Sequence, residues 1–303
     1  MLFKLKLYLA AVAGTVIHIG YPKAGSTWLQ AFFSANPALF YDGGLTDSYK
    51  QTGKVPENIA AKAGTEKVLV LSEEQLSVWQ GNLDIVGVKF QPFDIKLHQQ
   101  QVCESLHHQF PEANILIVTR GFASALKSMY SQYITIGGIC TFQQFLQHYG
   151  NIMAQFYDYG YLISLYRQTF GHKRVVVLPF ELLKDKPAAF LQLMQQGLQL
   201  PAFNFEGEKA NVALHVEEME SYRRLSLLLY GMVKWLPRKM AQMIYGSYVF
   251  MLYQRKFHGV LKMFRSQTEQ LHIPTETMAL FSGRAELLKY EEIFEPYLKE
   301  YLI

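Results

Sequence analysis

The sequence predicts an α/β fold in which helices cover both faces of a central parallel sheet. Short runs of aliphatic and β-branched residues, each closed by a glycine, proline or charged residue, alternate with longer amphipathic segments. Such alternation is typical of parallel strands joined by crossover helices. The 303 residues are half hydrophobic, which excludes a disordered chain, and two cysteines exclude a disulfide scaffold or a four-thiolate zinc site.

Buried strands are expected, in chain order, at residues 16–19, 68–71, 85–88, 115–118 and 175–178. Helical segments are expected at 28–34, 95–110 and 142–170. In parallel sheets, ligands bind just beyond the carboxyl ends of the strands. Polar and charged residues gather at these ends, among them Lys23, Glu73, Glu74, Lys89, Arg120 and Glu181. An active site is therefore expected at this edge of the sheet.

A glycine-rich loop, Gly-Tyr-Pro-Lys-Ala-Gly-Ser-Thr-Trp, follows the first strand. Its glycines, Gly20 and Gly25, have the spacing of a Walker A loop, but the lysine lies inside the loop at position 23. Backbone N–H groups and the following helix N-terminus would still face an anion, with the lysine and two hydroxyls beside it. The alternative is an ordinary strand-to-helix turn without a ligand.

This loop resembles the 5′-phosphosulfate loop of sulfotransferases that use 3′-phosphoadenosine-5′-phosphosulfate (PAPS), which runs close to Tyr-Pro-Lys-Ser-Gly-Thr-Thr-Trp. The resemblance implies that the lysine contacts the bridging oxygen, that the hydroxyls hold the 5′-phosphate and that the tryptophan packs on adenine. The donor-binding residues that it implies are Lys23, Ala24, Gly25, Ser26, Thr27 and Trp28. An ordinary core position remains the alternative for Trp28.

A second element of the same family is an arginine at a strand end with a serine eight residues later, both of which bind the 3′-phosphate. Arg120 and Ser128 match this spacing, and Ser124 is the weaker candidate. Arginine at a strand tip could bind the phosphate bidentately. Gly121-Phe122 departs from the Asn-Pro or Asp-Pro usual in the family, which affects the loop shape.

A third match begins at the strand 175–178, which Phe180-Glu181 follows where the family has Tyr-Glu. Lys209 and Asn211 lie where the family often has a segment that closes over the nucleotide. The resemblance covers about residues 15–215. It implies a PAPS-binding core over residues 1–215, followed by a helical C-terminal extension over 216–303 that packs on the same domain.

Sulfuryl transfer needs a base for the acceptor and positive charge at the sulfonate. Glu73, with Glu74 as the alternate, is our candidate base, as in carbohydrate-type sulfotransferases, because Gln91 stands where cytosolic members have a histidine. Lys89 is a candidate to stabilise the sulfonate. The alternatives are helix-starting carboxylates in solvent and a surface lysine. His18, inside a strand, is expected to be a core residue, and no Cys/His spacing indicates a metal.

The segment 221–268 carries nine Lys and Arg and no Asp or Glu, so the rest of a chain of net charge +4 has a net charge of −5. Its apolar and aromatic residues with flanking cations are typical of an interfacial membrane element, and Pro237 should divide it into two helices. A buried pair of helices beside the donor site is the alternative, and nucleic-acid binding is disfavoured because the segment is too apolar.

We therefore predict a PAPS-dependent sulfotransferase that acts on a saccharide or glycolipid and requires no metal. The rivals are a P-loop nucleotide kinase and a non-catalytic protein that binds a membrane surface. The N-terminal apolar stretch is shorter than a signal peptide, and no window is long enough to span a membrane. A cytoplasmic protein is expected, peripheral on the inner face of the membrane.

Overall fold

The computed structural model of the chain describes residues 14–41, 67–77, 83–84, 86, 89–90, 94–207, 214, 216–254 and 271–303. At its centre lies a five-stranded sheet in which every strand pair is parallel. The strand order is β2-β3-β1-β6-β7. The strands are β1 (Thr15–Gly20), β2 (Leu39–Tyr41), β3 (Val68–Glu73), β6 (Asn114–Thr119) and β7 (Val175–Pro179). The predicted α/β fold class is thus confirmed.

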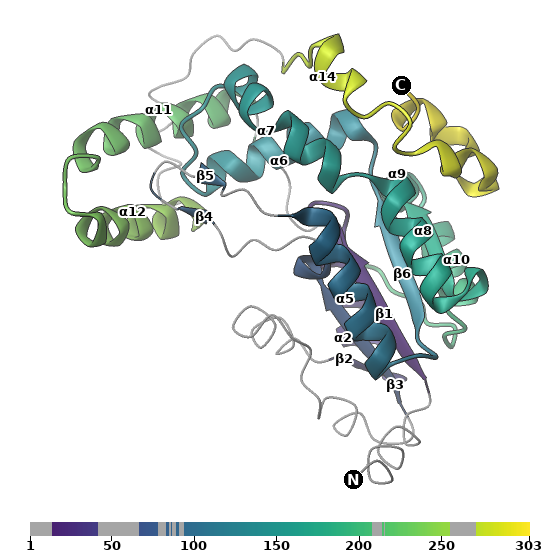
Figure 1. Ribbon diagram of the computed structural model, residues 1–303. Helices are drawn as coiled ribbons and strands as arrows, with labels where there is room; N and C mark the ends of the chain where they lie inside the picture. Colours follow the sequence, from purple (N-terminus) through teal and green to yellow (C-terminus); the bar gives the residue numbers. More distant parts are fainter. Residues whose placement is uncertain are drawn as a thin grey trace.

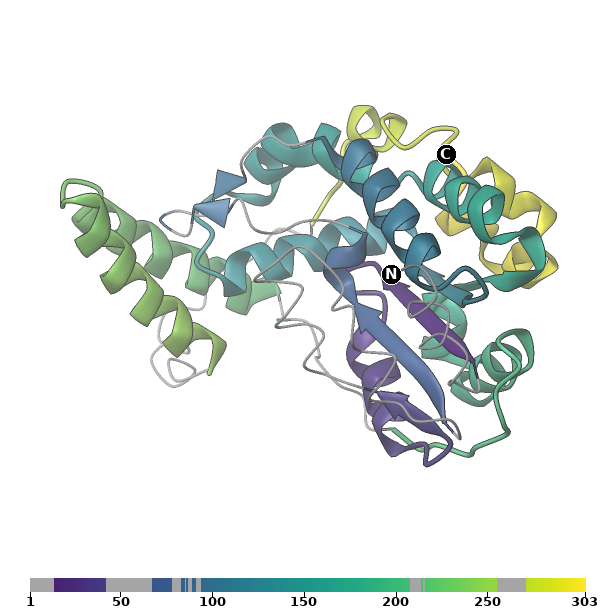
Figure 2. The ribbon, with the colours of Figure 1, turned by 60° about the horizontal axis from the view of Figure 1, so that its bottom comes forward.

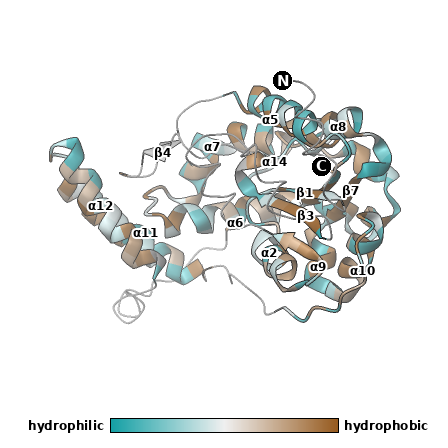
Figure 3. Ribbon diagram, turned by 90° about the horizontal axis from the view of Figure 1, so that it is seen from below, coloured by the Kyte–Doolittle hydropathy of each residue, from teal (hydrophilic) through white to brown (hydrophobic). Residues whose placement is uncertain are grey.

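Helices lie on both faces of this sheet (Figure 3). On one side are α5 (Ile95–Gln109) and α8 (Tyr159–Phe170), and on the other are α2 (Ser26–Ala35), α9 (Phe180–Asp185) and α10 (Pro187–Gly197). Because both faces are covered, β1, β3 and β6 are buried over almost their whole length. This burial explains their continuous aliphatic sequences, since a half-exposed strand would alternate apolar and polar residues.

Of the strand predicted at 85–88, only Val86 is among the described residues, and it lies in a turn. The described residues on either side form a two-stranded antiparallel pair, β4 (Leu83–Asp84) with β5 (Lys89–Phe90). The parallel sheet instead has β2, only three residues long, at its edge. A short apolar run does not reveal which sheet it joins, because the periodicity of a buried strand is the same in either.

A second group of helices extends from the carboxyl edge of the sheet (Figures 1 and 2). It starts with α6 (Phe122–Thr135) and α7 (Phe142–Phe156), whose capping box at Thr141 is complete. The predicted segment 142–170 is two helices because Asp158 caps α8 and starts it anew. An antiparallel hairpin of α11 (Val216–Val233) and α12 (Arg238–Tyr253) then projects away from the sheet, and Pro237 separates its helices as predicted.

The C-terminal residues return to the sheet. They form α14 (Thr275–Ala279) and two 3-10 helices, η5 (Glu286–Tyr290) and η6 (Glu292–Glu300). The last of these, η6, packs against β7. Among the described residues, no helix combines the length and apolarity needed to cross a membrane.

His18 lies in the core, as predicted, on β1 opposite Ser72 of β3. Its Nδ1 lies 2.8 Å from the Ser72 hydroxyl, whereas its Nε2 is buried with no hydrogen-bond partner among the described residues. Burial lowers the pKa of His18 to about 3. The imidazole is therefore neutral in the folded protein at any moderately acidic pH.

This burial predicts an acid-sensitive fold. Below about pH 6.5 the unfolded chain binds a proton at His18 and the folded chain does not, so protonation favours unfolding until the pH falls to about 3. As the pH is lowered through this range, the free energy of unfolding should decrease faster in the wild type than in His18→Gln. The two slopes should differ by about 1.4 kcal/mol per pH unit. Urea unfolding between about pH 6 and pH 4 measures it, and equal slopes would contradict the burial of a neutral imidazole.

Candidate active site

The backbone between β1 and α2 has an unusual shape that is suited to an anion. Lys23 has a φ of 65° and Gly25 a φ of 88°, both left-handed, with Ala24 between them outside that region. Backbone of alternating hand turns successive N–H groups toward one point and forms an anion-binding nest. The first helical hydrogen bond of α2 runs from Leu29 N to Gly25 O, so the preceding N–H groups of the helix have no partner within it.

Individual loop residues differ in what they offer. Ser26 is buried, and its Oγ has no hydrogen-bond partner among the described residues. Thr27 is exposed at the same helix end. The N–H of Ala24 is used inside the loop, where it donates to Tyr21 O at 3.2 Å. Ala24 therefore shapes the loop, and Ser26 and Thr27 are the residues that present hydroxyls.

The loop is anchored at its start by Tyr21, which is fully buried. Its ring stacks on Tyr157 at 5.6 Å between centroids and meets the edges of Phe156 and Tyr159 at 5.4 and 5.1 Å. Burial raises the pKa of Tyr21 well above its usual value, so its hydroxyl stays protonated. This aromatic cluster at the junction of α7 and α8 fixes the point where the chain leaves the sheet.

Arg120, just beyond β6, holds the loop from the other side. Its Nη1 donates to the carbonyl oxygen of Lys23 at 2.5 Å, and its Nε donates to Ser124 Oγ at 2.9 Å. The guanidinium also lies 4.7 Å from the centre of the Phe180 ring. At least two of its five N–H groups are thus engaged within the protein.

Helix α9 packs closely against the loop at Gly25. A methyl group on Gly25 would lie 2.7 Å from Leu183 Cδ2 and 3.3 Å from Phe180 Cδ2. Glycine is therefore required at position 25 for two reasons, its positive φ and the absence of space for a side chain. Phe180, which replaces the family's tyrosine, has a role here as the platform under Arg120.

A chain of hydrogen bonds beneath Arg120 reaches the C-terminal segment. Glu181 accepts from the N–H of Gly121 at 2.9 Å and from the Tyr301 hydroxyl at 2.6 Å. Thr119, at the end of β6, donates to the same Tyr301 oxygen at 3.1 Å. The Tyr159 hydroxyl bonds both backbone groups of Arg120. These contacts fix the backbone from which the arginine extends.

The two carboxylates after the β3 run lie close to the loop but differ in position. Glu73 is the last residue of β3, buried, and its Cα pairs with Ile19, immediately before Gly20. Glu74 begins a short 3-10 helix, η2 (Glu74–Leu76), and is half-buried. Burial lowers the pKa of Lys23, and the Glu74 carboxylate opposes this effect. Glu74 is therefore the carboxylate that acts electrostatically on Lys23.

Other predicted site residues are placed less directly. Trp28 is half-buried in an aromatic cluster, 5.2 Å from Phe205 and 6.3 Å from Phe190 between centroids. Ser128 is buried on α6, two turns beyond Arg120. Ser124 is a partner of Arg120, in keeping with its weaker standing as a phosphate ligand.

Three predicted residues are not joined to the site by the structure. Lys89 belongs to β5 and pairs with Asp84, so the position at a parallel strand end that suggested its role is wrong; its side chain lies outside the described residues. Lys209 and Asn211 lie outside the described residues altogether.

Sequence reasoning missed the residues that support Arg120. Glu181 was noted at a strand end, but Tyr159 and Tyr301 carried no local signal, because they contact Arg120 and Glu181 from 39 and 120 residues away. The chain's abundance of tyrosine was the only hint of such buried hydroxyl partners.

The structure brings the loop and Arg120 together at adjacent strand ends. The nest, the start of α2, Lys23 and the Ser26 hydroxyl follow β1, and Arg120 follows the neighbouring β6, with Ser128 buried further along α6. Two anionic groups of one ligand could therefore be bound at this edge, and the buried Glu73 carboxylate lies at the end of the neighbouring strand β3.

Comparison with known proteins adds solved structures but no sequence relatives. No protein-family model and no curated protein matches the sequence. Three solved structures that do match are sulfotransferases. One, from Alicyclobacillus acidocaldarius, is 14% identical with a TM-score of 0.48 over 72% of this chain and 94% of its own.

The second is mouse sulfotransferase SULT7A1 complexed with PAP, 11% identical with a TM-score of 0.38 over 73% of this chain and 68% of its own. The third is the sulfotransferase domain from the curacin biosynthetic pathway, 12% identical with a TM-score of 0.42 over 92% of this chain and 99% of its own. With all three TM-scores below 0.5, the assignment of function rests on the site of this chain itself.

The closure over Gly25 predicts a specific instability. Gly25→Ala should lose about 1–2 kcal/mol of unfolding free energy from left-handed backbone strain and more from the contact with Leu183. Gly283→Ala is the matched control, because its φ of 76° imposes similar strain with nothing within 4 Å of the new methyl group. Urea unfolding of both variants measures the difference. Equal losses would show that α9 does not close on the loop.

Proposed function

We propose that this chain is a PAPS-dependent sulfotransferase. The observation that supports it is the 2.5 Å contact between Arg120 Nη1 and the Lys23 carbonyl. It joins the two motifs that resemble the phosphate-binding elements of this family, although 97 residues separate them in the chain. A kinase-like rival lacks such support, since Gly25 is followed by Ser26 and not by the Walker lysine.

The loop fits the 5′-phosphosulfate end of the donor. The buried Ser26 Oγ has no hydrogen-bond partner among the described residues. A buried hydroxyl without a partner lowers the stability of the folded protein by about 1–3 kcal/mol. A phosphate oxygen would satisfy it together with the N–H groups at the start of α2. Ser26, Thr27 and the Gly25 backbone would hold this end, with Trp28 toward the base.

Arg120 and Ser128 would recognise the 3′-phosphate. Arg120 keeps N–H groups beyond those given to Lys23 and Ser124, and Phe180 holds its guanidinium plane in position. Because this arginine also holds the carbonyl of Lys23, its position is coupled to the shape of the loop. Lys209 and Asn211 remain candidates to close over the nucleotide.

The chemical step needs a base, a stabilised leaving group and an acceptor. The acceptor oxygen forms a bond to sulfur while the bond from sulfur to the bridging phosphate oxygen breaks, and the acceptor's proton must be removed. We assign proton removal to Glu73 and stabilisation of the leaving phosphate oxygen to Lys23. The Glu74 carboxylate partly offsets the burial that lowers the pKa of Lys23. Lys89 remains a candidate contact to the sulfonate.

The proposed acceptor is a hydroxyl, or an amine, of a saccharide or glycolipid. What supports a lipid-linked acceptor is the basic and apolar segment 221–268, which would hold the enzyme peripherally at the inner face of a membrane. Residues 1–215 would form the donor-binding core and 216–303 the helical extension.

Recognition of the 3′-phosphate is testable by calorimetric titration with 3′,5′-diphosphoadenosine and with AMP, which lacks that phosphate. Arg120→Ala should weaken binding of the diphosphate by about ten- to hundredfold, because a charge-assisted contact is lost. A looser loop would weaken the binding of both ligands equally. The informative quantity is therefore the affinity for the diphosphate divided by the affinity for AMP.

Ser128→Ala should lower the same ratio by about fivefold. Ser131→Ala is the matched control, since Ser131 lies one turn further on α6 and accepts from the N–H of Leu214. A wild-type protein that binds AMP as tightly as the diphosphate would overturn the assignment, and strict dependence of activity on ATP and Mg²⁺ would favour the kinase.

The base is testable by transfer of radiolabelled sulfate from PAPS to lipid and polysaccharide extracts. Glu73→Gln should lower the transfer rate by about 10²–10⁴-fold without changing the affinity for 3′,5′-diphosphoadenosine. Glu74→Gln should lower it by less than about tenfold, because that carboxylate acts through Lys23. If the two effects were reversed, Glu74 would be the base.

A further inference from the structure

The α11–α12 hairpin is apolar on its outside. Of the large hydrophobic side chains that are exposed in the described part of the chain, nine of thirteen lie on it. The most exposed are Trp235, at 82%, Met232 and Met243, at 67% each, and Leu228, at 65%. Soluble proteins expose such side chains singly and seldom gather them on one element. Apolar residues recur along both helices in Figure 3.

The contact between the two helices is, in contrast, partly polar. Ser226 Oγ and the Tyr248 hydroxyl lie 2.9 Å apart, and both residues are buried. The Ser226 hydroxyl also lies 2.9 Å from the carbonyl of Tyr222. A helix of a soluble protein normally turns its apolar face inward and its polar face to water. This hairpin buries Val233, Tyr245 and Leu252 beside the hydrogen-bonded hydroxyls, and it still leaves Leu, Met, Phe and Trp side chains exposed on its outside.

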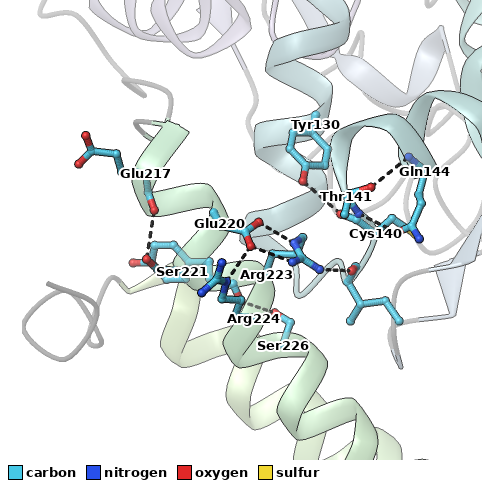
Figure 4. A network of polar contacts seen from close by, with 12 residues as sticks. Tyr130, Cys140, Thr141, Gln144, Glu217, Glu220, Ser221, Arg223, Arg224 and Ser226 are labelled. Carbon is cyan, nitrogen blue, oxygen red and sulfur yellow. Dashed lines mark hydrogen bonds and ion pairs between the residues drawn. The ribbon is translucent and has the colours of Figure 1, made fainter. Parts of the chain in front are cut away.

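Two hydrogen bonds hold the base of the hairpin against the body. Arg223 donates to the carbonyl of Ile139 at 3.3 Å, and Tyr245 donates its hydroxyl to the carbonyl of Gly137. Within α11, Glu220 holds the Arg223 side chain at 2.7 and 2.8 Å and also bonds Arg224 (Figure 4). The hairpin is thereby joined to the turn that follows α6, the helix that carries Ser128.

Cations surround the apolar tip. Lys234, Arg238 and Lys239 are exposed, and from Ser221 to Gln254 there is no acidic residue. The Lys234 ammonium lies 5.0 Å from the centre of the exposed Trp235 ring. Glu220 balances the two arginines at the base, so the positive charge is concentrated at the tip.

We propose that the tip of this hairpin, residues 232–243, docks on the anionic surface of a lipid bilayer and inserts its apolar side chains. Anionic headgroups complement the three cations, and the acyl region takes Met232, Trp235 and Met243. A second copy of the chain could cover the same apolar residues, but it would bring two sets of cations together, which opposes self-association. The inference goes beyond sulfuryl transfer and does not depend on it.

Vesicle co-sedimentation without donor or acceptor tests the proposal. The full chain should bind phosphatidylcholine vesicles that contain about 30 mol % phosphatidylserine far more tightly than vesicles of phosphatidylcholine alone. The double variant Trp235→Ser, Met243→Ser should lose about tenfold or more in affinity. Tyr290→Ser is the matched control, because Tyr290 is 87% exposed but lies in η5, away from the hairpin, and it should bind like the wild type.

The contribution of the cations is tested with the double variant Lys234→Gln, Lys239→Gln. It should bind the anionic vesicles about fivefold more weakly for each charge removed. Lys173→Gln with Lys299→Gln removes two exposed cations elsewhere and should change little. All variants should keep the wild-type circular dichroism and the wild-type affinity for 3′,5′-diphosphoadenosine, because no altered residue belongs to the donor site.

Insertion, as distinct from surface attraction, is tested by quenching of tryptophan fluorescence with brominated acyl chains. The quenched component should disappear in Trp235→Phe. Absence of binding to anionic vesicles, or binding without quenching of Trp235, would overturn the proposal. So would a wild-type dimer in light scattering that Trp235→Ser converts to monomer, since a second copy would then be the occupant. Failure of sulfate transfer would leave these measurements unaffected.

Discussion

The site depends on the left-handed backbone at Lys23 and Gly25, which L-residues resist. Three groups stabilise this turn from different directions: the Tyr21 ring in its aromatic cluster, the Arg120 guanidinium on the Lys23 carbonyl, and Leu183 and Phe180 against Gly25. Strain of about 1–2 kcal/mol per non-glycine residue persists only where neighbours over-determine it. Because Arg120 is one of those neighbours, the residue proposed to recognise one phosphate also shapes the nest for the other.

Much of this arrangement could be predicted from the sequence, and the limits have physical reasons. Lys23 and Arg120 were expected to meet, because each follows a buried parallel strand and such strands end at one edge. The edge strand β2 was not predicted, since three residues carry too little pattern to detect. Val86 was placed in a strand and lies in a turn, because a short apolar run does not specify its own conformation. The support from Glu181 and Tyr301 was invisible, since no local periodicity links residues so far apart.

The structure also changes what the charge distribution means. From sequence, the acid-free segment could have been a core pair or an interfacial element. The described helices bury the Ser226–Tyr248 contact together with part of the apolar side chains, and they leave nine large apolar side chains exposed. The hairpin thus carries an exposed apolar surface on a base that hydrogen bonds from Arg223 and Tyr245 hold to the body. A rigid attachment of this kind would set the orientation of the donor site relative to whatever the tip contacts.

The hydrogen bond from Thr119 to Tyr301 has a consequence for how the protein is made. Its partners are 182 residues apart, and a ribosome adds about 5–20 residues per second. The strand that carries Arg120 therefore emerges on the order of ten seconds or more before the tyrosine that completes its support. Glu181 emerges partway through that interval and then lacks one of its two hydrogen-bond donors until a further 120 residues have been added. The phosphate-binding edge is thus among the last parts of the nascent chain to reach its final form.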